Sequence, residues 1–516
     1  MSRNKLRLYG MVLQEENIRQ AIKEVNSYKG SKIPGPDGIN KYNNFDIDII
    51  IKEVKLRLRR RKKVCSRIIK ILKDNGDIRK LTVINYFDRI AQQAVKRVIS
   101  PVIEPKQSIY SFGFRQGIGA KIAASRVANC IRNIPNIHSV EIDIKSCFDN
   151  IRLDMALNCL RELGVTDGKL LQTIKHLMFV SRNYQGVGLE QGTILGPLLC
   201  NCVLNKLDRY MEDTFELNNV QNYAQAYRRH KGEWIKWHEA LKRKLSIRYI
   251  RFADDIFIAC HNEEEPEYVK SKVKEFIENV LKLKVNEEKT KIRTNGFEYL
   301  GFKFITEKFK NRKNIWIRMK DEKKYIKKLG DFHFRTNKNF YDFLLWFRGV
   351  LYYFDICNDL SKFLNKTTTR LYTRSTKNTS VIKQESSSVY VCREGRKKVE
   401  VDIYEWRKNS RTSYAEYMYG SFWIKEREKI KTLPYENEYR IYAYMLYTRQ
   451  KGLSEVTGKR LDINNMCIHH IKPRKAQGRN EINNLILVET EIHKEIHYGT
   501  SKEFKIEKYR KQLNKE

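Results

Sequence analysis

Residues 248–258 read RYIRFADDIFI, and the adjacent Asp254 and Asp255 interrupt two short apolar runs. Alternating apolar side chains predict two β-strands joined by a tight turn. Aspartate is disfavoured inside strands, and adjacent carboxylates repel each other unless they share a cation. The stretch therefore predicts a β-hairpin whose turn carries an acidic pair able to hold a cation.

A further predicted strand, Ser139 to Ile144 (SVEIDI), carries Asp143. Mg²⁺ is a hard cation that binds through carboxylates together with the phosphates of a substrate. Two such ions can stabilise both the attacking and the leaving oxygen of a phosphoryl transfer. The alternative is an acidic turn that faces water and an unrelated aspartate. We expect Asp143, Asp254 and Asp255 to form one site, with two Mg²⁺ ions.

The whole chain is strongly basic. Its 516 residues include 101 Lys and Arg against 61 Asp and Glu, a formal charge of +40. Such an excess indicates a polyanionic partner, most simply nucleic acid, although a lysine-rich genome is the alternative. No apolar run is long enough to span a membrane, and the N-terminus lacks the apolar core of a signal peptide. We expect no membrane partner and a cytosolic location.

The ten cysteines include no CxxC pair. This absence disfavours both a disulfide framework and a four-cysteine zinc site. We therefore expect reduced thiols and no structural zinc.

Periodicity outlines the remaining elements. Apolar spacing predicts helices at 15–28, 153–163, 197–210 and across 321–371, and strands at 68–72, 81–84 and 298–305. Strands interleaved with helices indicate an α/β or α+β body up to about residue 310. The Ser/Thr-rich stretch 373–389 is predicted to be a linker.

The order of these motifs resembles that of a reverse transcriptase of the group II intron-encoded type. The matching segments are 34–40 (PGPDGIN), 66–83, 88–95, 108–120, 141–151 (EIDIKSCFDNI), 191–208, 248–258 and 288–304. The resemblance implies an α+β multidomain fold. Fingers and palm of a right-hand polymerase would occupy residues 1–310, and a helical thumb or maturase domain residues 311–375.

The same resemblance assigns roles to single residues. Asp143, Asp254 and Asp255 would be the catalytic, metal-binding carboxylates. Four further residues would contact the incoming dNTP: Lys73, Arg79, Phe148 and Gln191. Phe148 would exclude a ribose 2′-hydroxyl by its bulk, which selects deoxynucleotides.

Histidines gather near the C-terminus. Four of the ten fall at His469, His470, His493 and His497. The i,i+4 spacing of the last two places both rings on one helical face, a common metal-binding geometry. Neighbouring residues on a strand face opposite sides, so one member of the first pair can bind metal while the other acts as a base. A histidine-rich surface without chemistry is the alternative.

Residues 467–497 resemble an HNH endonuclease, which has a ββα-metal site. By this resemblance His470 is the general base and Asn484 holds its loop. His469 and His493 would bind one divalent metal, Mg²⁺ or similar, with His497 as a further ligand. The HNH domain would span residues 446–516, after a linker and DNA-binding region at 376–445.

Together the two resemblances imply a group II intron-encoded protein. It would act as RNA-directed DNA polymerase, splicing maturase and DNA endonuclease in intron mobility. Its partners would be intron RNA, target DNA and dNTPs, in a bacterial cytoplasm or an organellar matrix or stroma. The alternatives are a defence-associated reverse transcriptase with a nuclease effector, and a splicing maturase without catalysis. Flanking DNA with or without an intron would separate them.

Overall fold

A computed structural model describes most of the chain. The described residues are 8–72, 78–115, 118–134, 136–178, 186–215, 217, 247–309, 312–333, 336–376, 382–385, 389–394, 397–402, 442–443, 446–447, 449–450, 452–473 and 484–498. None of the helices in these ranges has the length and apolar content that a membrane-spanning segment needs.

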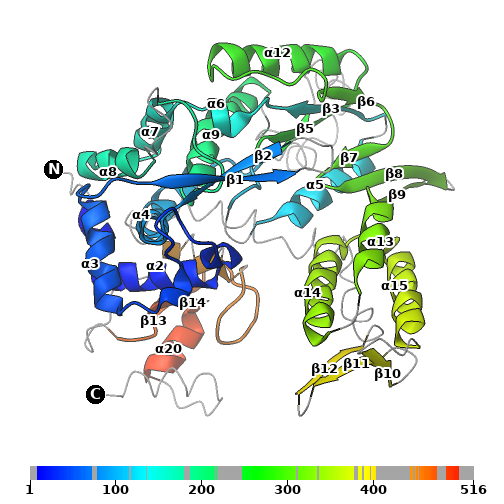
Figure 1. The fold of residues 1–516 in the computed structure, drawn as a ribbon. Coiled ribbons are helices and arrows are strands. Elements are labelled where there is room, and N and C mark those ends of the chain that lie inside the picture. Colours follow the sequence, from blue (N-terminus) through cyan, green and yellow to red (C-terminus); the bar gives the residue numbers. More distant parts are fainter. Residues whose placement is uncertain are drawn as a thin grey trace.

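The N-terminal part combines helices with one long hairpin (Figure 1). Its elements are α1 (Leu8–Val12), α2 (Glu15–Ser27), the 3₁₀ turns η1 (Lys29–Lys32) and η2 (Lys41–Asn43), α3 (Ile47–Leu58), β1 (Ser66–Leu72), β2 (Ile78–Ile84), α4 (Tyr86–Ile103) and the turn η3 (Glu104–Lys106). In α2 the residues at spacings of three and four, Ile18, Ile22 and Val25, are buried. This stripe is the reason why the segment forms a helix that packs on its neighbours.

A four-stranded antiparallel sheet follows. Its order is β4-β5-β3-β6, with β3 at His138–Asp143, β4 at Arg248–Phe252, β5 at Asp255–Cys260 and β6 at Lys291–Arg293. The predicted hairpin at 248–258 is thereby confirmed. Alternate side chains of β5 enter two apolar clusters, Ile256 and Ile258 one, Phe257 and Ala259 the other. The sheet is therefore covered on both faces, which fixes its register firmly.

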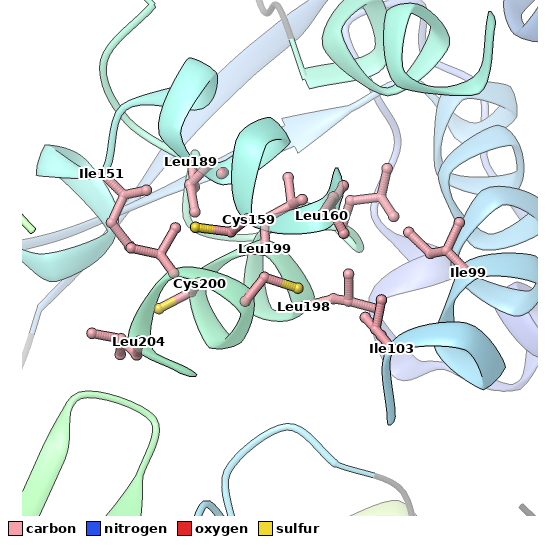
Figure 2. Close-up of a cluster of buried hydrophobic side chains, with 14 of the residues drawn as sticks. Ile99, Ile103, Ile151, Cys159, Leu160, Leu189, Leu198, Leu199, Cys200 and Leu204 are labelled. Carbon is pink, nitrogen blue, oxygen red and sulfur yellow. The ribbon is translucent and has the colours of Figure 1, made fainter. Parts of the chain in front are cut away.

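Helices pack around this sheet: α5 (Ala120–Asn133), α6 (Cys147–Asn150), α7 (Leu153–Glu162), α8 (Gly168–Met178), α9 (Gly196–Thr214) and α12 (Glu265–Asn279). Figure 2 shows side chains of α4, α7 and α9 gathered in one cluster, among them Ile99, Leu160 and Leu199. All three are fully buried. Pro197, near the start of α9, suits a position where no helical N–H bond is needed.

A second sheet and a helical group follow (Figure 1). Strands β7 (Phe297–Tyr299), β8 (Phe302–Phe309) and β9 (Arg312–Met319) form an antiparallel sheet, and α13 (Glu322–Asp331), α14 (Asn337–Phe354) and α15 (Leu360–Ser375) come next. The pairing of Phe309 with Arg312 continues the ladder across the hairpin. The boundary expected between 310 and 311 thus falls inside a hairpin.

The prediction of a linker at 373–389 is wrong for the described residues of this stretch. Helix α15 continues to Ser375, and β10 (Ile382–Gln384) pairs with β11 (Val389–Glu394), which pairs with β12 (Lys397–Asp402). A Ser/Thr-rich composition suggested coil. In α15, however, the Thr373 hydroxyl donates to the Thr369 carbonyl one turn earlier, at 2.9 Å, which lets threonine remain helical.

The C-terminal described residues form a ββα unit. Strands β13 (Met466–His470) and β14 (Leu485–Glu489) are antiparallel, and α20 (Thr490–Tyr498) begins directly after β14. Leu487 and Val488 of β14 and Ile496 of α20 are fully buried. Part of the expected DNA-binding region, residues 403–440, lies outside the described residues.

Candidate active site

The carboxylates predicted to act together meet at one end of the four-stranded sheet. Asp143 is the last residue of β3 and pairs directly with Asp255, the first residue of β5. Asp254 lies in the turn between β4 and β5. Ala253, just before it, has the left-handed φ of 57°, a conformation that an alanine adopts only when its surroundings hold it there.

The three carboxylates disturb one another's protonation. Burial first, then the charges of Asp254 and Asp143, raise the pKa of Asp255 to about 6. Burial also raises the pKa of Asp254, to which Asp143 adds. Although Asp255 is open to solvent on one side, packed atoms surround most of it. Like charges held together among oxygen donors fit a hard divalent cation such as Mg²⁺, which would relieve this repulsion.

Asp143 is held in position by two residues that sequence reasoning did not identify. The Asn286 side-chain amide donates to Asp143 Oδ2 at 3.1 Å, and the Asn286 backbone N–H donates to the Asp143 carbonyl at 2.8 Å. Lys289 Nζ lies 3.5 Å from Asp143 Oδ2. Nothing in the local pattern of the VNEEKT stretch signals this role, because it depends on how the chain returns to β3.

Three of the residues expected to contact a nucleotide, Arg79, Phe148 and Gln191, lie in described parts of the chain. Phe148 lies in α6, and its ring meets that of Phe114 edge to face at 5.9 Å. Its carbonyl accepts a bond from the Leu189 N–H at 2.8 Å. Arg79 is exposed on β2, and its positive charge partly offsets the rise that burial causes in the pKa of Asp254. Lys73 lies outside the described residues.

Gln191 is anchored to the hairpin through its backbone. The Thr82 N–H of β2 donates to the Gln191 carbonyl at 2.7 Å. Gly192 follows with φ 105°, and a β-carbon there would lie 2.5 Å from the Thr82 carbonyl oxygen. Only glycine fits this close approach. The segment before α9 and the hairpin β1–β2 are thus held together.

A second candidate site lies in the ββα unit. The rings of His469 (β13), His493 and His497 (both α20) converge, with a ligand nitrogen from each within 4.8 Å of the other two. Burial, then the charges of His493 and His497, lower the pKa of His469 to about 3. Neutral imidazoles are the form that binds metal, and three of them suit a divalent ion with an open coordination position.

The other two predicted residues of this unit lie at its edge. His470 pairs with Leu485 across the strands, whereas His469 pairs with Ile486, so the two histidines face opposite sides. Asn484 bridges the loop after His470: its Oδ1 accepts from the Lys472 N–H at 2.7 Å and its Nδ2 donates to the Lys472 carbonyl at 3.0 Å. Asn484 therefore holds the loop that follows His470 through both the backbone N–H and the carbonyl of Lys472.

Comparison with known proteins finds similarity in the part of the chain that contains the first site. Residues 71–304 match the sequence model of the family described as "Reverse transcriptase (RNA-dependent DNA polymerase)". The chain is 26% identical to protein YkfC of Escherichia coli, over 58% of this chain and 84% of that one. It is 27% identical to the group II intron-encoded protein LtrA of Lactococcus lactis subsp. cremoris, over 57% of this chain and 56% of LtrA.

A putative COX1/OXI3 intron 2 protein of Saccharomyces cerevisiae is 27% identical over 54% of this chain and 36% of its own length. The chain therefore spans most of YkfC but only about half or less of these two intron proteins. A solved telomerase structure from Candida albicans aligns over 76% of this chain and 65% of its own, at 13% identity and a TM-score of 0.39. The histidine cluster lies beyond the residues that match the family.

The matched residues contain the whole carboxylate site. They begin in the hairpin β1–β2 and end in β8, and they include Asp143, Asp254 and Asp255. Their fold is a mixed α/β arrangement built around the sheet that carries these residues. The part of this chain that is similar to the reverse transcriptase family is therefore the part that carries the carboxylates.

Proposed function

We propose that the chain is a group II intron-encoded protein that copies RNA into DNA, assists splicing of its intron and nicks target DNA. The observation that carries the polymerase function is the meeting of Asp143, Asp254 and Asp255 at the end of β3 and β5. Similarity to LtrA and to two putative COX1/OXI3 intron proteins of Saccharomyces cerevisiae supports the intron assignment.

In the polymerase reaction a primer 3′-oxygen attacks the α-phosphorus of a dNTP and pyrophosphate leaves. Two Mg²⁺ ions held by the three aspartates would stabilise the attacking and leaving oxygens. Asn286 and Lys289 orient the Asp143 carboxylate. Arg79, exposed on β2, is available to bind the triphosphate. The Phe148 ring, braced by Phe114, would occupy the space of a ribose 2′-hydroxyl.

The ββα unit supports a second, hydrolytic activity. His469, His493 and His497 would hold one divalent ion, which lowers the barrier by stabilising charge on the phosphate and the leaving oxygen. His470 would take a proton from the attacking water, and Asn484 holds the loop that follows His470. The products would be a nicked strand with a free 3′-hydroxyl, which is the primer that the polymerase requires.

The charge of the chain supports the choice of partners. A net charge of +40 suits a protein that holds intron RNA, target DNA and a template–primer duplex. The helical group α13–α15 adds lysines and arginines such as Lys362, Lys366 and Arg370, and in this reading it forms the thumb.

Primer extension by the purified chain tests the polymerase assignment. Asp254→Ala should lower DNA synthesis on an RNA template by at least about 10³-fold, since it removes a metal ligand from the reacting phosphate. RNA binding and DNA nicking should persist. Extension at the wild-type rate in this variant would sink the assignment.

Strand-specific cleavage tests the nuclease. His470→Ala should abolish nicking of a labelled DNA strand and leave primer extension intact. Unchanged cleavage would refute the role of His470 as the base, and loss of both activities would point to a folding defect instead.

A further inference from the structure

A buried ion pair lies directly behind the catalytic turn. Arg251 of β4 and Asp208 of α9 are both fully buried. Arg251 Nε donates to Asp208 Oδ1 at 2.7 Å, and Nη2 donates to Oδ2 at 2.6 Å. The Tyr249 hydroxyl adds a bond to Asp208 Oδ1 at 2.8 Å. The two-point contact between fork and carboxylate fixes the plane of the guanidinium.

The remaining donors of Arg251 reach the catalytic turn, a second residue of α9 and the loop around Ser111. Nη1 donates to the Ala253 carbonyl at 2.8 Å and to Asn201 Oδ1 at 3.1 Å. Nη2 donates to Ser111 Oγ at 2.8 Å. Arginine has five N–H donors, and these contacts use all of them. One side chain therefore joins α9, β4, the loop around Ser111 and the turn that carries the catalytic pair.

The contact with Ala253 has the most direct bearing on the reaction. Ala253 has a left-handed φ of 57° and immediately precedes Asp254 and Asp255. An alanine keeps this conformation only where neighbouring groups hold it. The bond from Arg251 to the Ala253 carbonyl holds the peptide that follows this strained residue.

The 110–113 loop is tied to the Arg251 backbone and to Asn201. The Arg251 N–H donates to the Tyr110 carbonyl at 2.9 Å, and the Arg251 carbonyl accepts from Phe112 N–H at 2.8 Å. Asn201, which contacts Arg251, also donates to the Gly113 carbonyl at 2.6 Å. Gly113 lies against the Ala253 backbone. The turn is thus contacted both by the Arg251 side chain and by the Gly113 backbone of this loop.

Stability alone does not explain such a pair. Removing two charges from water costs free energy that their attraction only partly returns, and apolar residues of similar volume often stabilise a fold as well or better. What an apolar pair cannot supply is a set of five directional bonds. The pair is therefore better suited to hold a geometry than to add stability.

We infer that Arg251 and Asp208 are positioning residues of the polymerase centre, which hold the Ala253 turn so that Asp254 and Asp255 point at the reacting phosphate. The inference rests on the proposed polymerase function. It adds that the turn keeps its catalytic geometry through Arg251 and not through the hairpin ladder alone.

The decisive variant replaces both partners at once, Arg251→Met with Asp208→Leu, so that no buried charge is left unpaired. It should fold with a wild-type circular dichroism spectrum and bind template–primer duplex within twofold of the wild-type Kd. Its kcat for single-nucleotide extension should fall at least tenfold. In hydrogen–deuterium exchange, the peptide that contains residues 253–255 should exchange faster while peptides of α9 stay protected.

A matched control changes a buried ion pair elsewhere. Arg57 Nε lies 2.8 Å from Asp88 Oδ1, between α3 and α4, and both side chains are buried. Arg57→Met with Asp88→Leu should leave kcat and exchange at 253–255 within twofold of wild type. A similar loss of kcat in both double variants would mean that any disturbed core lowers activity, and would overturn the inference.

A single conservative variant covers the case in which the double variant does not fold. Arg251→Lys keeps the charge beside Asp208 but cannot reach five acceptors. It should retain the fold, with reduced kcat and faster exchange at 253–255. Wild-type kcat and exchange in a folded Arg251→Lys or double variant would overturn the positioning role. Failure of the wild-type chain itself to extend a primer would instead refute the proposed polymerase function.

Discussion

Gly113 lies so close to Ala253 that a β-carbon at position 113 would stand 2.3 Å from the Ala253 amide nitrogen. The two residues come from distant parts of the chain, and their contact brings the 110–115 loop onto the catalytic turn. Backbone cannot yield as a flexible side chain can, so the contact demands glycine at this position.

Gly113→Ala should therefore lower primer extension by about 10²-fold, because a displacement on the order of 1 Å at reacting groups costs about that much. Gly119, the residue just before α5, is the matched control, since no atom of the described residues lies within 4 Å of a β-carbon built there. Gly119→Ala should extend primers at the wild-type rate. Equal activity of the two variants would show that the turn tolerates displacement.

Phe148 should set the choice between deoxynucleotides and ribonucleotides. Phe148→Ala opens the space that its ring fills beside Phe114, so the ratio of kcat/KM for dNTP to that for rNTP should fall at least about tenfold. Single-nucleotide extension with matched dATP and rATP measures the ratio. An unchanged ratio would place the sugar elsewhere.

Loss of one histidine should release the metal of the ββα unit. His493→Ala removes one of three converging nitrogens, so binding of one divalent ion, followed by calorimetry with Mn²⁺ or Zn²⁺, should weaken by about 10²-fold or more. His333→Ala is the control, because His333 is exposed and far from the cluster in sequence. Equal binding by both variants would exclude the cluster as a metal site.

Asp88 should make stability depend on pH. Burial, only partly offset by Arg57, raises the pKa of Asp88 from an ordinary value of 3.8 to about 6. A raised carboxyl pKa means that ionisation opposes folding. Its contribution to stability is therefore fully present below about pH 4 and is lost as the pH rises through 6, by at most roughly 3 kcal/mol.

Asp88→Asn removes this dependence. The free energy of unfolding from denaturant titrations should fall less between pH 4 and 7 in Asp88→Asn than in the wild type. Glu263→Gln, which changes an exposed carboxylate, should keep the wild-type slope. A wild-type slope in Asp88→Asn as well would contradict the buried, protonatable Asp88.

Binding of RNA should weaken steeply with salt. The +40 charge implies release of many counterions, so log Kd should rise linearly with log of the salt concentration. Filter binding between about 50 and 200 mM salt should show a loss of several orders of magnitude. A flat response would mean that the lysines reflect genome composition and not contact with phosphate.

Local patterns in the sequence predicted the elements that carry both candidate sites. Alternation around Asp254 and Asp255 predicted the hairpin that the structure contains, because strand periodicity is a property of neighbouring residues. The i,i+4 spacing of His493 and His497 likewise predicted one face of a helix, now α20. Composition misled within 373–389, because the described residues 373–375 are helical and 382–384 are paired as a strand.

Only the tertiary structure decided which distant residues meet. The pairing of Asp143 with Asp255, the amide of Asn286 on Asp143 and the bond from Arg251 to Asp208 join positions far apart along the chain. Such partners are selected by how two apolar faces of one sheet are covered, and no periodicity within a single segment records that choice. The sequence by itself predicted which chemical groups form the candidate sites. The packing of α9 and the 110–115 loop against β4 and β5 decided how Asp254 and Asp255 are oriented.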